Sequence, residues 1–183
     1  PHHTSSVTAL VGGGMGAPRP GLISLANHGV LFLDEAPEFQ LPVLESLRQP
    51  LESGEVVINR SGGTAKFPAE FQLVLAANPC PCGYNVGKGA RCVCSAGQKI
   101  KYASRLSGPL LDRVDIRMQI MPAAKAKLAM LRTAGPSKVN SAQLRGVVSE
   151  ARARSSARLA ATPWCINAKV PGSYLRKHLP IDE

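Results

Sequence analysis

Aromatic side chains are scarce in this sequence, at 4% of the 183 residues with a single tryptophan. Apolar residues as a whole reach 44%, so we expect one domain, or one with a piece of a second, around an aliphatic core. No stretch approaches the ~20 consecutive apolar residues of a membrane-spanning helix, and no N-terminal pattern indicates a signal peptide. These absences exclude transmembrane, collagenous and wholly disordered proteins, and they predict a cytoplasmic protein without a membrane partner.

Acidic residues are also few. The 22 Lys and Arg residues outnumber the 12 Asp and Glu residues, which leaves a net charge of +10. The excess is uneven, because residues 1–122 hold 11 basic and 9 acidic side chains (+2) whereas residues 123–183 hold 11 and 3 (+8). Such basic patches attract the phosphates of nucleic acids, but a basic helix is often only a solvated face. Charge alone leaves both interpretations open.

Four of the five cysteines fall in one short segment: Cys80, Cys82, Cys92 and Cys94. Without a signal peptide, a metal site is a better interpretation than a disulfide framework. Two Cys-x-Cys pairs supply four thiolates for a tetrahedral site, which favours Zn²⁺. This spacing is tighter than the usual ligand pair, so metal-free thiols and a redox switch stay open as alternatives. Cys165 stands apart, and we expect a buried or half-buried thiol there.

Three apolar runs predict the strands of a parallel sheet, at residues 30–33, 71–77 and 116–121. The first run has no polar alternation, which fits a strand covered on both faces. It ends in Asp34-Glu35, and the second run ends at Asn78. Polar side chains therefore follow two strands at the edge where open α/β sheets bind their ligands.

The remaining segments divide into helices, a loop and a hairpin. Apolar spacing predicts helices near residues 22–26, 40–49, 96–106, 124–133 and 141–159, and a last one from residue 173. In the helix at 141–159 the apolar residues form a stripe on one face. The glycines and prolines of residues 11–21 predict a loop. Two β-rich runs around Gly62-Gly63 predict a hairpin whose tip is flanked by Arg60 and Lys66.

An apolar strand that ends in Asp-Glu has the form of a Walker B element. In such an element the Asp holds the Mg²⁺ of a nucleotide and the Glu activates the attacking water. Taken alone the pattern is weak, because many buried strands end in an acid that caps the next helix. Asn78 adds an amide for the γ-phosphate, and Arg113 lies in a short turn from which an arginine finger could reach a neighbouring subunit. We assign no site role to His2 or His3.

The stretches that carry these features resemble the Mg-chelatase-like AAA+ ATPases of the ComM/YifB type, relatives of the magnesium chelatase motor subunit. The similarity covers most of residues 1–121, and a looser similarity continues in the tail. The matching stretches are Pro1-His-His-Thr, Val11-Gly-Gly-Gly, Pro20-Gly-Leu-Ile-Ser-Leu-Ala-Asn-His-Gly-Val-Leu-Phe-Leu-Asp-Glu, Leu75-Ala-Ala-Asn-Pro-Cys-Pro-Cys-Gly and Ser107-Gly-Pro-Leu-Leu-Asp-Arg-Val-Asp.

The resemblance implies an α/β fold, namely a partial AAA+ P-loop NTPase core in residues 1–121 and a linker with the start of a helical lid in residues 122–183. It implies site roles for single residues: Walker B for Asp34 and Glu35, sensor 1 for Asn78, and an arginine finger acting in trans for Arg113. It also implies that the hairpin points into a ring pore and touches DNA. Arg60 and Lys66 are then candidate phosphate contacts, and the alternative is that they only solubilise the hairpin.

The sequence contains no Gly-x-x-x-x-Gly-Lys-Ser/Thr loop, so the element that cradles the phosphates of ATP is missing. We therefore expect the middle portion of a ring-forming, hexameric motor, inactive as an isolated chain. In the intact parent, ATP and Mg²⁺ would drive DNA translocation or branch migration, a helicase-type activity in recombination or competence. One alternative is a protein-remodelling ATPase like magnesium chelatase. Another is a non-enzymatic, truncated remnant that binds zinc and nucleic acid.

Overall fold

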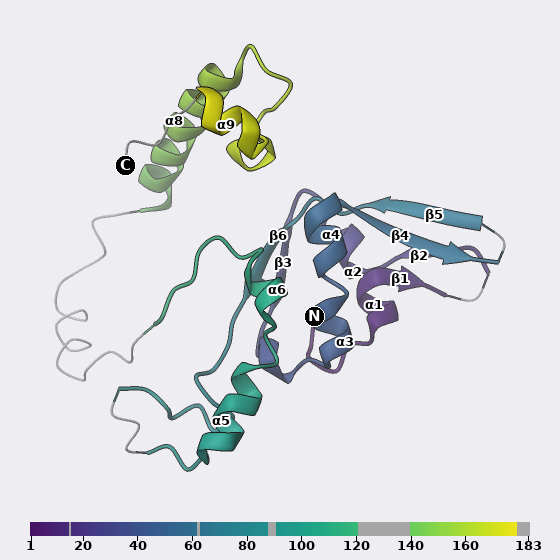
Figure 1. The fold of residues 1–183 in the computed structure, drawn as a ribbon, viewed down its shortest axis with the longest axis vertical. Coiled ribbons are helices and arrows are strands. Elements are labelled where there is room, and N and C mark those ends of the chain that lie inside the picture. Colours follow the sequence, from purple (N-terminus) through teal and green to yellow (C-terminus); the bar gives the residue numbers. More distant parts are fainter. Residues whose placement is uncertain (15, 62, 88–90, 121–139, 179–183) are drawn as a thin grey trace. The chain divides into compact units, whose positions relative to one another are not determined.

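A computed structural model of the chain describes residues 1–14, 16–61, 63–87, 91–120 and 140–178. The chain divides into two compact units, Pro1–Pro122 and Ala123–Glu183. In the described residues the first unit holds three two-stranded sheets and several short helices, and the second unit is helical (Figure 1). None of the described helices combines the length and the apolar character that crossing a membrane requires.

The centre of the first unit is a pair of parallel strands, β3 (Val30–Leu33) and β6 (Gln72–Leu75). Val30 pairs with Gln72 and Leu33 with Leu75, so the strands run in register to the same edge. The parallel pair with its surrounding helices confirms the predicted α/β class. The predicted third strand is wrong, because residues 114–120 form no strand. A strand needs a hydrogen-bonding neighbour, and no described strand pairs with this segment.

Strand β3 is covered on one face only, which corrects the expectation of a strand buried on both. Leu31 and Leu33 are buried at 4% and 0% exposure, whereas Val30 and Phe32 are 62% and 49% exposed. The residues of a strand point alternately to opposite faces. The sequence run is uniformly apolar, but the described residues cover only the face that carries the two leucines.

The buried face packs on short helices. These elements are α1 (Val7–Val11), α2 (Leu22–Leu25), the 3-10 helix η1 (Ala36–Glu38), α3 (Leu41–Glu45) and α4 (Arg48–Ser53). They contribute Leu10, Ile23 and Leu44 to the core, and Phe39, which follows η1 directly, joins them; each is fully buried. The predicted helix at 40–49 is divided into α3 and α4. Pro50 explains the break, because it has no N–H to donate to the carbonyl of Ser46.

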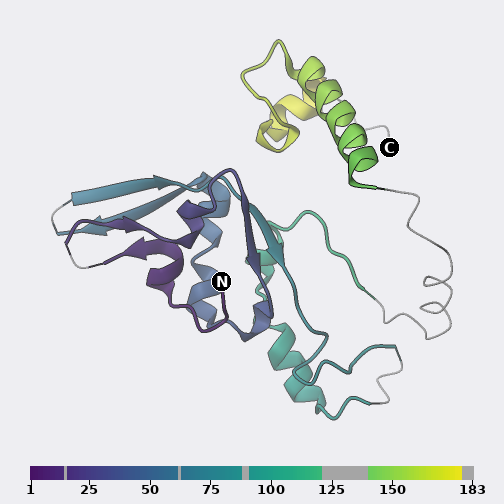
Figure 2. The same ribbon diagram turned by 180° about the vertical axis from the view of Figure 1, so that it is seen from behind.

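Two β-ribbons lie side by side at one end of the first unit (Figures 1 and 2). The larger is the predicted hairpin, β4 (Glu55–Arg60) with β5 (Gly63–Pro68). The smaller joins β1 (Gly12–Gly13) to β2 (Arg19–Pro20) inside the segment predicted as a loop. Only glycine fits at position 12, because φ is +104° and a Cβ atom would collide with the carbonyl oxygen of Arg19. At Gly21 a Cβ atom would collide with the carbonyl oxygen of Leu10.

After β6 the chain forms α5 (Ala96–Ala103) and α6 (Gly108–Leu111). Ser95 begins α5 with a capping box, in which its hydroxyl accepts from the N–H of Gln98 and the side chain of Gln98 accepts from the N–H of Ser95. This arrangement satisfies two N–H groups that have no partner inside the helix. The start of α5 is therefore fixed directly after the cysteine segment.

The second unit holds α8 (Ser141–Leu159), the 3-10 helix η2 (Asn167–Lys169) and α9 (Gly172–His178). The long helix α8 confirms the predicted helix at 141–159, but Leu144, Val147 and Val148 of its apolar stripe are exposed. The ring of Trp164 packs edge-on against Tyr174, 5.0 Å between centroids. The predicted helix at 124–133 lies outside the described residues. Cys165 is exposed, not buried or half-buried as expected.

Candidate functional site

The carboxyl ends of β3 and β6 bring together two polar segments that are far apart in the sequence. Backbone bonds continue beyond the strands: Ala76 N–H donates to Leu33 O at 3.0 Å, and Ala36 N–H donates to Ala76 O at 2.8 Å. The Asp34-Glu35 turn lies between Leu33 and Ala36, so it is held beside the segment that leads to Asn78. The predicted residues Asp34, Glu35 and Asn78 therefore share one edge, and all three are exposed.

The turn that carries the two acids has an unusual backbone. Glu35 lies in the left-handed region, with φ 51° and ψ 43°, which is uncommon for a residue other than glycine. Its N–H donates to Oδ1 of Asp34 at 2.9 Å. The two carboxylates are thus presented by a tight turn, and such outliers collect at functional sites.

His3 is a site residue that the sequence analysis missed. Its Nδ1 lies 3.3 Å from Oε2 of Glu35, and its ring lies 4.1 Å from the ring of His2. The imidazole nitrogen is thus within ion-pair distance of the carboxylate that the tight turn presents. No spacing rule connects residues 3 and 35, because the contact arises only from the tertiary fold.

Tyr102 of α5 is the second residue that the sequence analysis missed. Its side chain is 7% exposed. Burial raises the pKa of Tyr102, the charges of Glu38 and Glu35 raise it further, and the backbone N–H of Asn78 lowers it. The hydrogen bond from the backbone of Asn78 brings the phenol to the segment that follows β6. The scarcity of aromatic residues, at 4% of the chain, is the one feature of the sequence that draws attention to a single tyrosine.

Arg105 ties the end of α5 to the same edge. Its Nη1 donates to the carbonyl oxygen of Pro37 at 3.0 Å and lies 4.0 Å from Oε2 of Glu38. Pro37 and Glu38 belong to η1, which follows the turn of Asp34 and Glu35 directly. The segment after α5 therefore packs on the loop that carries the two acids.

Arg113, the predicted arginine finger, is held within its own chain. Its Nη2 lies 2.8 Å from Oε2 of Glu52 in α4, and its Nη1 donates to the carbonyl oxygen of Pro109 at 2.9 Å. Its Nε is buried without a hydrogen-bond partner among the described atoms. No described contact joins it to Asp34 or Glu35 of the same chain, so its role in trans stays a prediction.

Arg60 and Lys66 occupy different places on the hairpin. Arg60 pairs with Gly63 at the tip, and its guanidinium lies over the neighbouring ribbon, 3.2 Å from where a Cβ atom on Gly13 would stand. Lys66 pairs with Val57, further from the tip than predicted.

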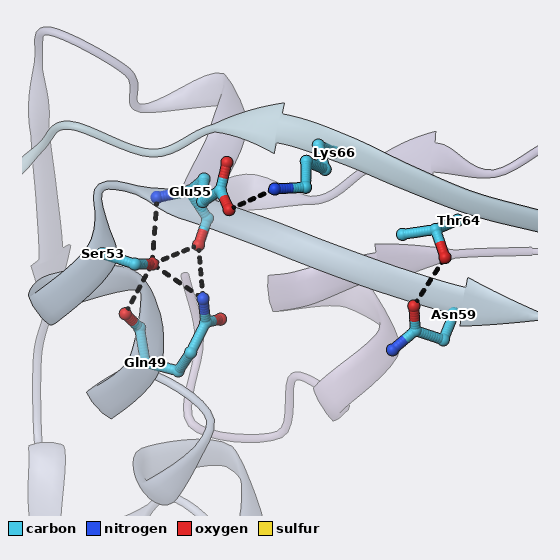
Figure 3. A network of polar contacts seen from close by, with 6 residues as sticks. All are labelled: Gln49, Ser53, Glu55, Asn59, Thr64 and Lys66. Atoms are coloured by element: carbon cyan, nitrogen blue, oxygen red, sulfur yellow. Dashed lines mark hydrogen bonds and ion pairs between the residues drawn. The ribbon is translucent and has the colours of Figure 1, made fainter.

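Lys66 is also engaged within the hairpin, where its Nζ lies 2.9 Å from Oε1 of Glu55 (Figure 3). Gln49 and Ser53 bind the backbone carbonyl of Glu55 at 3.0 Å each, so the base of the hairpin is fixed to α4. Of the two predicted phosphate contacts, Arg60 is the one presented at the tip.

The four predicted metal ligands come together. We call Cys80, Cys82, Cys92 and Cys94 the four-cysteine cluster, and their sulfur atoms all lie within 4.8 Å of one another. The Sγ atom of Cys80 lies 3.4 Å from that of Cys82 and 3.7 Å from that of Cys92. All four are free cysteines rather than disulfides. The structure therefore gathers a set of soft donors that suits Zn²⁺.

The thiols of this cluster differ in acidity. The backbone N–H groups of Tyr84 and Val93 lower the pKa of Cys82 to about 6. The backbone N–H of Cys82 lowers the pKa of Cys94, but desolvation and the neighbouring thiols outweigh it and raise that pKa to about 11.

Comparison with known proteins shows to which protein family this sequence is similar. The sequence model described as "Magnesium chelatase, subunit ChlI" matches residues 1–128. Uncharacterized protein Rv2897c of Mycobacterium tuberculosis is 47% identical over 177 residues, which are 97% of this chain and 34% of that protein. Competence protein ComM of Haemophilus influenzae and YifB of Escherichia coli are 55% and 51% identical over 120 residues, 66% of this chain and 23% of each relative.

The chain thus spans about a third or less of the length of these relatives. The family match runs through the Asp34-Glu35 turn, Asn78, the four-cysteine cluster and Arg113. The predicted resemblance is therefore confirmed: the chain belongs to the magnesium chelatase subunit ChlI family, as a member of the ComM/YifB type.

Proposed function

We propose that this chain is part of a ring-forming AAA+ ATPase and supplies the residues that hydrolyse ATP. The observation that carries the proposal is the pairing of β3 with β6, which places Asp34, Glu35 and Asn78 at one edge. Membership of the magnesium chelatase subunit family supports it. Residues 1–121 form part of the AAA+ core in this proposal, and residues 122–183 form the linker and the start of the helical lid.

Each residue at this edge has one task in the proposed reaction. Asp34 would hold Mg²⁺, Glu35 would orient the attacking water and accept its proton, and the amide of Asn78 would face the γ-phosphate. Mg²⁺ bound to ATP supplies positive charge at the reacting phosphates. His3 contacts Glu35 and Tyr102 packs beside Asn78, so both hold the reacting side chains in place.

Arg113 acts in trans in the proposed ring, which is a hexamer in the cytoplasm. The guanidinium stabilises the transition state in the neighbouring subunit. To reach it, Arg113 must leave its ion pair with Glu52. That pair is 30% and 70% exposed on its two sides, and exposed pairs of this kind contribute only about 0–1 kcal/mol. The exchange of partners is therefore energetically small.

DNA is the proposed substrate of the motor, which translocates along it or migrates branches. Arg60 at the hairpin tip contacts the phosphate backbone. Two observations support a nucleic acid: the net charge of +8 in residues 123–183, and the relative named Competence protein ComM.

The decisive experiment is ATPase activity of the protein that the complete reading frame encodes, with and without single- and double-stranded DNA. We expect DNA to stimulate hydrolysis and Glu35→Gln to abolish it. Glu150→Gln is a matched control, because it makes the same change at an exposed carboxylate of α8 that pairs with Arg154. Full activity of Glu35→Gln would remove the proposed base. The 183-residue chain alone has no phosphate-binding loop and should show no turnover above its own Glu35→Gln variant.

A protein-remodelling ATPase is the second candidate, and the family description of magnesium chelatase subunit ChlI favours it. In that case hydrolysis responds to a protein partner and not to DNA. Hydrolysis that is indifferent to DNA would therefore shift the assignment to the remodeller.

A further inference from the structure

The sulfur atoms of the four-cysteine cluster are spaced as a tetrahedral metal site requires. Ligands at the Zn–S distance of about 2.3 Å stand about 3.8 Å from one another at the corners of a tetrahedron. The observed separations include 3.4, 3.7 and 3.7 Å, and every pair lies within 4.8 Å. A disulfide has its sulfurs only about 2.0 Å apart. The arrangement is therefore that of ligands around one ion.

The backbone around the cluster is built to present the sulfurs. The N–H of Gly83 donates to Cys80 O at 3.0 Å, and Gly83 turns the chain in the left-handed region with φ 77°. The guanidinium of Arg91 lies over the ring of Tyr84, 4.7 Å from its centroid, and so joins the two arms of the loop beside the second cysteine pair.

The donor set selects the metal. Four thiolates without an open position describe a structural site, and tetrahedral sulfur coordination is typical of Zn²⁺. Cys80 is fully buried and the other three are half-buried, so the ion would be largely enclosed by protein. A closed site of this type contributes to folding and not to chemistry.

The position of the cluster gives such an ion a specific task. Cys80 follows Asn78 by two residues, and Cys94 stands next to Ser95, which begins α5. After α5, Arg105 donates to the carbonyl oxygen of Pro37 at 3.0 Å, beside the turn of Asp34 and Glu35, and within α5 Tyr102 bonds to the backbone of Asn78. One ion would thus connect the end of β6 to the start of the helix that packs against the catalytic edge.

We propose that the four-cysteine cluster binds one Zn²⁺, which closes the loop between β6 and α5 and thereby holds Tyr102 beside Asn78. Zn²⁺ acts here as a brace of the catalytic edge, separate from Mg²⁺ and ATP. The inference does not depend on ATP hydrolysis, because it concerns the folded chain alone.

The first test is the metal content and coordination of the purified 183-residue chain. We expect about one Zn²⁺ per chain, and replacement by Co²⁺ should produce the strong visible absorption of tetrahedral thiolate coordination. The double variant Cys82→Ser/Cys92→Ser should lose both, while Cys165→Ser, which changes the exposed cysteine of the second unit, should lose neither. The site would be overturned if the double variant kept the same zinc content. It would also be overturned if the unmodified chain bound no zinc after refolding with Zn²⁺.

The second test is hydrogen exchange of backbone amides before and after Zn²⁺ is removed with a chelator. We expect amides of α5 to exchange about tenfold faster or more without the metal, because a helix released from its anchor opens more often. Amides of the β4–β5 hairpin serve as the internal control and should be unchanged. Equal protection of α5 with and without Zn²⁺ would overturn the brace, even where the metal binds. Neither outcome bears on ATPase activity, so the ATPase assay tests the proposed motor function independently of this experiment.

Discussion

Nδ1 of His3 lies 3.3 Å from Oε2 of Glu35, so the N-terminal segment reaches the acid that follows β3. A contact of this kind can set the orientation of a general base without touching the substrate. It makes His3 a positioning residue in the proposed reaction.

We predict that His3→Ala lowers kcat of the full-length ATPase by about fivefold, the equivalent of about 1 kcal/mol for the lost contact with Glu35. KM for ATP should stay unchanged, because the histidine does not contact the nucleotide in the proposal. His3→Asn retains an N–H donor and should recover part of the rate. His2→Ala is the control, since His2 bonds to Thr4 instead. An unchanged kcat in His3→Ala would remove the role.

Arg113→Ala should abolish hydrolysis and spare ATP binding, as measured by steady-state turnover and by equilibrium nucleotide binding. Glu52→Gln removes the partner of Arg113 in its own chain and should leave hydrolysis intact, with a change in stability of about 0–1 kcal/mol. If Arg113→Ala still hydrolyses ATP, the finger lies elsewhere. If Glu52→Gln is as inactive as Arg113→Ala, hydrolysis requires the ion pair itself, and Arg113 does not leave Glu52 to act in a neighbouring subunit.

Arg60→Ala should lower the slope of log binding constant against log salt by about one unit, as expected for one lost phosphate contact. Lys66→Ala should change the slope less, because Glu55 already pairs with Lys66 at 2.9 Å. Binding of labelled single-stranded DNA to the full-length protein at a series of salt concentrations measures both. Equal slopes for Arg60→Ala and the unmodified protein would exclude the tip as a contact.

Ser107→Ala should destabilise the first unit at neutral pH by lowering its Tm by about 2–4 °C. The hydroxyl of Ser107 donates to Glu45 at 2.6 Å, and this bond, followed by the one from Arg48, lowers the pKa of Glu45. A lowered pKa contributes stability above the unfolded-state pKa, and this contribution is lost as the pH falls through the folded-state pKa. The difference between variant and parent should therefore shrink at acidic pH.

Thermal unfolding followed by circular dichroism at neutral and acidic pH tests this dependence. Ser104→Ala is the matched control, because the hydroxyl of Ser104 donates to the carbonyl oxygen of Lys101 and to no carboxylate. A destabilisation by Ser107→Ala that is equal at both pH values would contradict the role of Glu45.

Local sequence patterns predicted the elements that depend on local physics. The hairpin around Gly62-Gly63, the run that became β3 and the helix at 141–159 were all predicted, because turn glycines and apolar spacing act within a few residues. The predicted strand at 116–121 is absent in its described residues, 116–120, since a strand exists only where a neighbour pairs with it. His3 and Tyr102 were missed for the related reason that their contacts join residues distant in sequence.

The features of the candidate site also separate into those that the sequence predicted and those that it did not. Asp34, Glu35 and the cysteines were predicted as site residues because their residue types and spacing form recognisable motifs in the sequence. The different surroundings of Arg60 and Lys66 were not, because the ion pair to Glu55 follows from cross-strand register. Sequence pattern therefore points to the candidate reacting groups more readily than to the residues that hold them in place.

Gly12 and Gly21 show that a family signature can record shape as well as chemistry. A side chain at either position would strike a backbone carbonyl of the neighbouring segment. Neither glycine contributes to hydrolysis in the proposed reaction, yet a side chain at either position would disturb the fold. A descendant that had lost its acids would still have to keep both glycines to fold. The two glycines therefore indicate the fold of a chain, whereas only the acids indicate its proposed activity.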